Sequence, residues 1–189
     1  MELIDKDEIE ARKNEIAGKI KAGAVFIYGT DTIYGIGCDA TNSKAVNKIR
    51  KIKQRKDAPF SVIAPSKEWV LENCTAKGLG KELNKLPGPY TLILNLKNKN
   101  CVSKHVNPAN KTLGVRIPNH WISDFVSELG MPVVTTSVNK TDEPYLTSPD
   151  ELQIGIKEKV DFMVDEGKIL GKPSIIIDLT KEKKQIIRR

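Results

Sequence analysis

The stretch Ala22–Gly37, "AGAVFIYGTDTIYGIG", joins an apolar run to a polar, glycine-rich segment. Its first part, "AVFIYG" at 24–29, is continuously apolar up to its last residue, which is typical of a strand buried on both faces of a sheet. The segment that follows carries polar side chains and then glycines: Thr30, Asp31, Thr32, Tyr34, Gly35 and Gly37. Ligands of open α/β sheets bind beyond the ends of such strands, and glycine allows close approach. A structural turn capped by Thr and Asp would use the same residues, so the stretch predicts a buried strand that ends in either a turn or one wall of a site.

Strand patterns alternate with helix patterns along most of the chain, which predicts an α/β fold. We expect helices over 5–23, 41–52, 66–74, 119–130 and 149–160, with Asp5, Asn42 or Ser43, Ser66, Asn119 and Ser148 as N-caps. We expect strands over 24–29, 59–64, 90–96, 112–118, 132–138, 162–167, 174–180 and 184–189. The neighbouring strands within 90–118 and those after Asp161 suggest hairpins, so the sheet should be mixed parallel and antiparallel. No repeat, low-complexity tract or linker divides the sequence, and residues 1–189 should form a single domain.

The composition limits the partners and the location. The formal net charge of +7 favours anionic partners such as phosphates or nucleic acid, although a lysine-rich surface also serves solubility. The longest apolar runs fall far short of the ~20 residues needed to span a bilayer. The charged start "MELIDKDEIE" is unlike a secretory signal. We therefore expect no membrane association and a cytoplasmic location.

The metal-binding and redox-active residue types are few. Cys38, Cys74 and Cys101 lack the C-x-x-C spacing, so we expect reduced thiols rather than disulfides or a zinc site. His105 and His120 lie in different segments, without carboxylates spaced for a metal triad. We expect ordinary surface histidines and no metal ligands from the protein.

A cluster of cations marks the end of the second expected helix, in "KIKQRKDAPF" at 51–60. Lys53 and Arg55 would point to nearly opposite sides if the helix continued, since successive helical residues are about 100° apart. Pro59 pushes its predecessor out of the helical region, which favours an extended exit with both cations on one side. Such a pair could neutralise a phosphate or a carboxylate. A basic helix end that answers the helix dipole is the alternative.

Two further segments carry polar groups at strand ends. "VVTTSVN" places hydroxyl and amide side chains after an apolar strand, at Thr135, Thr136, Ser137 and Asn139. They form either another wall of the same crevice or an ordinary turn. Arg116, in "GVRIP", alternates onto the face opposite Val115 and Ile117. It could grip a carboxylate with two hydrogen bonds or lie on the solvent side.

Taken together, six segments in order resemble the YrdC family, the threonylcarbamoyl-AMP synthases. They are "TDTIYGIG" from Thr30, "KQR" from Lys53, "PGPYT" from Pro87, "GVRIP" from Gly114, "SVN" from Ser137 and "PSIIIDL" from Pro173. The resemblance implies an open, twisted sheet flanked by helices, with a basic concave groove, in the single-domain form of the family. It implies synthesis of threonylcarbamoyl-AMP from L-threonine, bicarbonate and ATP with Mg²⁺, and release of pyrophosphate. The product would pass to a downstream threonylcarbamoyl transferase for the modification of tRNA.

The resemblance also implies roles for individual residues. Lys53, Arg55, Ser137 and Asn139 would form the catalytic set around the carbamate and the phosphates. Threonine would bind Thr30, Arg116, Ser137 and Ser174, with Tyr34 shaping the groove. ATP would contact Thr112, Thr147 and Arg188 as well as Lys53, Arg55 and Asn139. The chain departs from the family where Gly29 and Lys56 replace usual prolines, and it lacks a histidine in "PFSVIA".

Two alternatives stay open from the residues alone. A basic groove could bind tRNA or double-stranded RNA without any synthase activity, although aromatic residues suited to base stacking make up only 5% of the chain. A groove protein of the same fold could also act on another substrate. We identify no catalytic base, because Asp31 is as suited to a turn as to accepting a proton.

Overall fold

The computed structural model describes residues 1–109, 111–141 and 143–188. Within these ranges, eleven strands form one mixed sheet in the order β1-β9-β2-β3-β8-β4-β7-β6-β10-β11, with β5 paired to β6. The strands are β1 (Glu2–Asp5), β2 (Phe26–Tyr28), β3 (Gly35–Gly37), β4 (Ser61–Ile63), β5 (Cys74–Thr75), β6 (Tyr90–Leu96), β7 (Thr112–Arg116), β8 (Val133–Ser137), β9 (Phe162–Asp165), β10 (Ile175–Asp178) and β11 (Gln185–Ile187). The helices are α1 (Lys13–Lys21), α2 (Ser43–Lys53), α3 (Lys67–Asn73), α4 (Leu79–Leu83), α5 (Trp121–Leu129) and α6 (Ile154–Lys157), with 3-10 turns η1 (Lys6–Glu8) and η2 (Pro149–Glu151).

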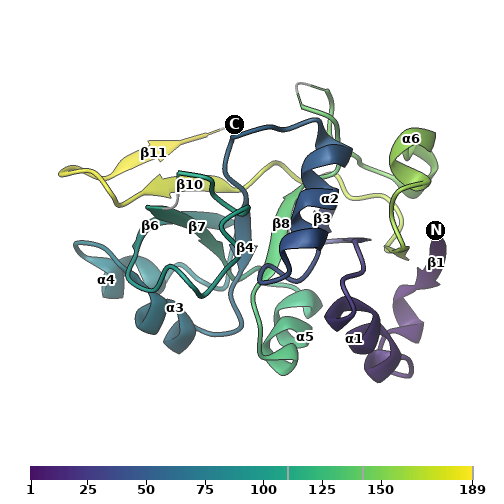
Figure 1. Ribbon diagram of the computed structural model, residues 1–189, viewed down its shortest axis with the longest axis horizontal. Coiled ribbons are helices and arrows are strands. Elements are labelled where there is room, and N and C mark those ends of the chain that lie inside the picture. The colour runs from purple at the N-terminus through teal and green to yellow at the C-terminus, as the bar shows by residue number, and fades with distance from the viewer. Residues whose placement is uncertain (110, 142, 189) are drawn as a thin grey trace.

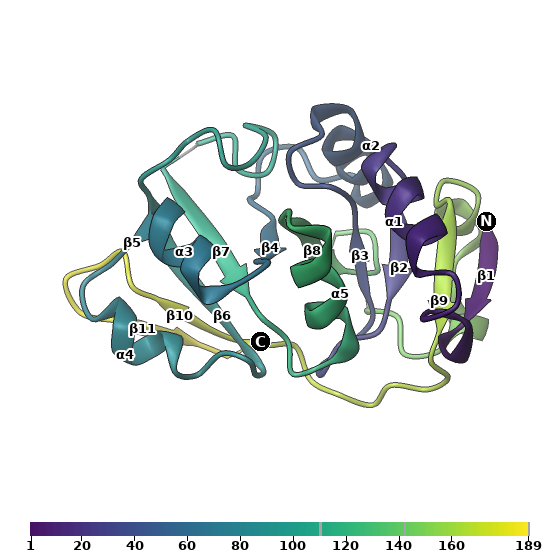
Figure 2. The same cartoon turned by 90° about the horizontal axis from the view of Figure 1, so that it is seen from below.

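The sheet is mixed, as predicted. β9 runs parallel to its neighbours β1 and β2, and β4/β7 and β6/β10 are also parallel pairs. The expected hairpin partners β6 and β7 pair antiparallel, and so do β10 and β11. β9 and β10 follow each other in sequence but lie in opposite halves of the sheet, so the segment between them crosses the molecule (Figure 2).

Both faces of β2 are covered, which explains its continuous apolar sequence. Phe26 and Tyr28 face a cluster that contains Ile16 and Ile20 of α1 and Phe125 of α5. Val25 and Ile27 point the opposite way and join a cluster that includes α2. Figure 1 accordingly shows α2 above the strands of this half, and α1 and α5 below them.

Three of the predicted helices differ in the structure. The first begins at Lys13, because Asp5 caps η1 by accepting the Asp7 N–H (2.9 Å). The helix expected over 149–160 is broken into η2 and α6 by extended Leu152, whose half-buried side chain packs on the core. Gly155 weakens a continuous helix there as well. The cap position of α5 is His120 rather than Asn119.

Four elements were missed: β1, β3, β5 and α4. β3 is only three residues long with glycine at both ends, a composition that ordinarily weakens a strand. Cys38, Cys74 and Cys101 are free thiols, as expected. Among the described residues, no helix combines the length and apolar character that a bilayer crossing would require.

Candidate functional site

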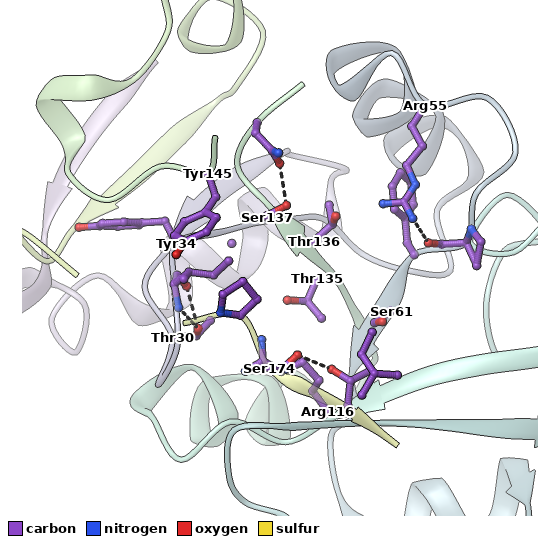
Figure 3. A pocket seen from close by; sticks show the side chains of 18 residues that line it. Thr30, Tyr34, Arg55, Ser61, Arg116, Thr135, Thr136, Ser137, Tyr145 and Ser174 are labelled. Atoms are coloured by element: carbon purple, nitrogen blue, oxygen red, sulfur yellow. Dashed lines mark hydrogen bonds between the residues drawn. The ribbon is translucent and has the colours of Figure 1, made fainter. Parts of the chain in front are cut away.

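A cavity of about 360 Å³ lies where the two predicted strand ends meet. The meeting point is fixed by the antiparallel pairing of β3 and β8, which places Gly35 opposite Ser137. Figure 3 shows Thr30, Tyr34 and Tyr145 on one side of the cavity and Arg55 and Ser61 on the other. The lining residues are Thr30, Ile33, Tyr34, Gly35, Arg55, Pro59, Phe60, Ser61, Thr91, Arg116, Thr135, Thr136, Ser137, Asn139, Tyr145, Pro173, Ser174 and Ile176. The only charged groups among these are two arginines, so the described wall is suited to anions.

The turn after β2 is a rigid scaffold for this wall. The Thr30 hydroxyl donates to the Ile33 carbonyl (2.7 Å) and accepts the Thr32 and Ile33 N–H groups (both 3.2 Å). Thr30 is buried at the cavity edge, and its hydroxyl is thus already committed to the turn. The sequence left a turn and a site wall as alternatives, and the structure shows a turn whose residues also line the cavity.

Asp31 positions Arg116 rather than facing the cavity as a base. Its carboxylate accepts from Arg116 Nη2 (2.8 Å) and from the Asn119 N–H (3.0 Å). Thr32 Oγ1 accepts a further bond from the same Nη2 (3.0 Å). Both carboxylate oxygens of Asp31 are therefore engaged.

Arg116 stands on the cavity wall and not in solvent. Burial lowers the pKa of Arg116 and the charge of Asp31 opposes this, but an arginine stays protonated in proteins. Its buried Nε has no hydrogen-bond partner among the described residues. Asp31 holds one edge of the planar Arg116 guanidinium, and Nε has no described partner. A guanidinium fixed in this way is suited to binding a carboxylate.

Lys53 lies behind the cavity wall, and its side chain is hydrogen-bonded to the turn after β8. Its Nζ donates to the Ser137 carbonyl (2.6 Å), the Asn139 carbonyl (2.9 Å) and Asn139 Oδ1 (2.8 Å). Ser137 Oγ donates to the same Oδ1 (2.6 Å). Burial and then the charge of Arg55 lower the pKa of Lys53 to about 7. The ammonium thus shapes the S-x-N turn, while Ser137 and Asn139 themselves line the cavity.

Arg55 reaches the cavity because helix α2 ends abruptly. Gln54 adopts a left-handed conformation (φ 52°), so the chain turns one residue after Lys53, before the predicted extended exit at Pro59. Arg55 Nη2 donates to the Pro59 carbonyl (2.8 Å), and its guanidinium lies 5.3 Å from the centroid of the Phe60 ring. Lys53 and Arg55 are close neighbours, yet only Arg55 lines the cavity.

The opposite wall comes from the segment that crosses between β9 and β10. Ser174 shares a hydrogen bond of 2.7 Å with Thr91 of β6. The Tyr34 hydroxyl donates to the Gly167 carbonyl (2.8 Å) and accepts the Glu166 N–H (3.0 Å). Burial raises the pKa of Tyr34 to about 12, so the ring shapes the wall while its hydroxyl stays protonated.

Three residues assigned to ATP lie outside this cavity. Thr112 is bound by Asn107, which donates to its carbonyl (2.8 Å) and its hydroxyl (3.2 Å). The Thr147 hydroxyl donates to Glu151 (2.7 Å), and Arg188 is exposed after β11. Their role toward ATP stays a prediction.

Sequence reasoning missed several residues that organise the site. Arg50 donates to the carbonyls of Arg55, Lys56 and Ala58, and it thereby holds the loop beneath Arg55. In the sequence, Arg50 is one more cation on a lysine-rich helix, and no local pattern distinguishes it from its neighbours. The expectation that His120 is a surface histidine was wrong, because its Nε2 lies 3.0 Å from the buried carboxylate of Glu166. Tyr145, which lines the cavity, was also missed.

No cluster of three or more Cys, His, Asp or Glu side chains is placed to hold a metal ion in the ranges 1–109, 111–141 and 143–188. The polar groups of the cavity are hydroxyls, an amide and guanidinium groups. They are hydrogen-bonding groups for an anionic organic substrate.

Known proteins are similar to this chain in sequence and in fold. The profile of the Sua5/YciO/YrdC family, described as "Telomere recombination", matches residues 18–189. A putative threonylcarbamoyl-AMP synthase of Methanocaldococcus jannaschii is 36% identical over 183 residues, 94% of this chain and 83% of that protein.

Two solved structures add the likeness in three dimensions. P. abyssi Sua5 complexed with L-threonine is 27% identical, with a TM-score of 0.86 over 99% of this chain and 56% of that chain. E. coli YciO is 26% identical, with a TM-score of 0.85 over 100% of this chain and 94% of that chain. This chain therefore spans little more than half of the Sua5 chain and nearly all of YciO. It belongs to the Sua5/YciO/YrdC family.

Proposed function

We propose that this protein is an L-threonylcarbamoyladenylate synthase, a nucleotidyltransferase that converts L-threonine, bicarbonate and ATP into threonylcarbamoyl-AMP and pyrophosphate. One observation carries the proposal: Arg116, fitted for a carboxylate, shares a cavity with Arg55 and the S-x-N turn. The names of the Methanocaldococcus jannaschii relative and of the threonine-bound Sua5 structure support the same activity.

Threonine would bind at the Arg116 side of the cavity. The carboxylate would bind the guanidinium of Arg116, which lines the cavity and is held on its Nη2 side by Asp31. Ser174, Thr30 and Tyr34 also line the cavity and would surround the rest of the amino acid. The amine and the side chain of the amino acid would then face the hydroxyl groups of the cavity.

Carbamate and phosphates would bind at the Arg55 side. The neutral amine of threonine attacks the carbon of bicarbonate, and water leaves after proton transfer to give a carbamate. A carbamate oxygen then attacks the α-phosphorus of ATP, and the bond to pyrophosphate breaks. Arg55, Ser137 and Asn139 would stabilise the charge that develops, while Lys53 holds the S-x-N turn in place.

Mg²⁺ would arrive as the counter-ion of ATP, bound chiefly to its phosphates. The product is a reactive mixed anhydride, so a transferase that uses it for tRNA modification should follow, and we place both in the cytoplasm. Residues Thr112, Thr147 and Arg188 would contact the nucleotide where it extends beyond the described cavity.

Release of pyrophosphate from ATP tests the proposal when threonine and bicarbonate are omitted in turn. Synthesis requires both, and Arg55→Ala should lower turnover about a hundredfold, as expected when one charge-stabilising donor is lost. Lys51→Ala removes an exposed lysine in the last turn of α2, close in sequence to Arg55, and should leave turnover unchanged.

Other results would identify other functions. Turnover of ATP that ignores threonine would mean a different substrate in the same groove. RNA binding that weakens steeply with salt, without pyrophosphate release, would mean an RNA-binding module.

A further inference from the structure

Gly29 occupies a position that has no room for a side chain. A Cβ atom at residue 29 would lie 2.3 Å from Oε1 and 2.6 Å from Cδ of Glu166. The φ angle of Gly29 is not in the left-handed region, so space rather than backbone conformation requires glycine here. The Gly29 N–H donates to the same Oε1 (2.8 Å), a bond that proline could not make.

The Glu166 carboxylate is buried and fully engaged. Its second oxygen, Oε2, lies 3.0 Å from Nε2 of His120 and 3.7 Å from Nζ of Lys6. Only 5% of the Glu166 side chain is exposed, so a carboxylate that lost these partners would be costly to keep here. Glu166 therefore ties the end of β2 to the start of α5 and to η1.

The backbone beside Glu166 holds the other end of the same turn. The Glu166 N–H and the Gly167 carbonyl both bond the Tyr34 hydroxyl. Further along, a Cβ at Gly171 would lie 1.6 Å from the Thr32 carbonyl oxygen, so this segment also presses against the middle of the turn. The crossing segment thus contacts the turn 29–34 at its beginning, middle and end.

This turn carries the residue that orients Arg116. Asp31 lies in its centre and accepts from Arg116 Nη2, and Thr32 accepts from the same atom. A displacement of Gly29 should therefore also displace Asp31 and Thr32, which hold Arg116.

We propose that Glu166 is a positioning residue for substrate binding, matched to Gly29, and that it acts through Asp31 on Arg116. The role in threonine binding rests on the function proposed above. The matching of Glu166 to Gly29 rests on the geometry alone.

Variants at both positions test the pair. Gly29→Ala should raise the KM for threonine at least tenfold with a smaller change in kcat, because the new Cβ displaces the turn. Adding Glu166→Ala to Gly29→Ala removes the clash and should bring the KM back to that of Glu166→Ala alone. Glu166→Gln keeps an oxygen acceptor for Gly29 and should raise the KM less than Glu166→Ala does.

Glu82→Ala is the matched control. Glu82 is also a buried carboxylate paired with lysine, at 2.9 Å from Lys184, but it lies on α4 away from the cavity. Equal KM values for Glu166→Ala and Glu82→Ala at equal loss of stability would overturn the positioning role.

Amide hydrogen exchange gives a readout that does not depend on activity. Exchange at 29–34 should accelerate in Glu166→Ala and not in Glu82→Ala, whatever the substrate. Unchanged exchange there would overturn the pairing, whereas accelerated exchange in a protein inactive with threonine would refute only the proposed function.

Discussion

At the scale of the residue, Arg116 and Lys53, two cations that the sequence analysis selected, make different contacts. Arg116 faces the cavity and keeps a donor that no described residue uses, whereas all three protons of Lys53 are directed at oxygens of the S-x-N turn. A fixed, forked guanidinium is suited to recognising a planar anion, and a compact ammonium can bind three oxygens at once. Arg116 is thus the candidate for substrate recognition and Lys53 for holding the site together.

Arg116→Lys tests whether the forked geometry of the guanidinium is needed for threonine binding. Lysine keeps the charge but cannot bind Asp31 and a substrate carboxylate side by side, so at least one charge-assisted hydrogen bond is lost. Such a bond contributes about 1.5–3 kcal/mol, which predicts a rise in the KM for threonine of roughly 10- to 150-fold. Steady-state pyrophosphate release at varied threonine measures it.

Arg12→Lys serves as the control for that variant, because Arg12 lies in a surface cluster with Glu2, Glu8 and Glu15. It should leave the KM unchanged. An Arg116→Lys enzyme with a normal KM would show that the guanidinium does not bind the substrate.

At the scale of the element, local sequence rules predicted the long strands and the well-capped helices. β6 has the predicted bounds, and α2 and α3 are capped by Asn42 and Ser66 as expected. The rules failed where contacts from elsewhere decided the outcome. β3 forms only because β2 and β8 pair with it, and extended Leu152 splits the last helix.

Arg50→Ala tests how α2 supports the site. Arg50 donates hydrogen bonds to the carbonyls of Arg55, Lys56, Ala58, His105 and Val106. Its guanidinium also lies 4.6 Å from the Phe60 centroid. Alanine leaves several of these carbonyls without a donor, so the free energy of unfolding should fall by at least about 2 kcal/mol. Urea unfolding measures it.

Lys44→Ala, an exposed lysine on the same helix, is the control and should change the free energy of unfolding by less than about 0.5 kcal/mol. A small effect of Arg50→Ala would mean that the loop carbonyls find water instead. The turn at Gln54 and the contacts of Arg55 with Pro59 and Phe60 would then hold Arg55 without this support.

At the scale of the whole molecule, the cavity lies where the two halves of the sheet join. β3 and β8 meet at Gly35 and Ser137, and the crossing segment returns from β9 to β10 over the same point. Residues from positions 30 to 176 therefore converge on one space. Charged side chains are buried at that junction, so replacing one of them should affect both the stability of the fold and the site.

Lys53→Met tests that connection through the pH dependence of stability. The pKa of Lys53 is about 7 in the folded protein, below the value of about 10.4 expected in the unfolded chain. Between these values the unfolded state binds more protons, so raising the pH favours the folded state through this group. The free energy of unfolding of the wild type should therefore rise relative to Lys53→Met between pH 7 and about 10.

Urea unfolding of both proteins at several pH values measures the difference, and the comparison cancels contributions from other titrating groups. Parallel curves for the two proteins would show that Lys53 keeps its ordinary pKa. The ammonium would then be fully stabilised by its three oxygen acceptors.

The sequence by itself determined the α/β class, the buried strand β2, the mixed sheet and several of the residues that line the cavity. It could do so because strand burial, helix caps and polar strand ends are local patterns. Only the tertiary structure decided that Asp31 orients Arg116, that Lys53 lies behind the wall, and that the Glu166 carboxylate fills the space beside Gly29. These contacts join residues that are 84 or more positions apart, and no local pattern encodes which distant side chain fills a given space.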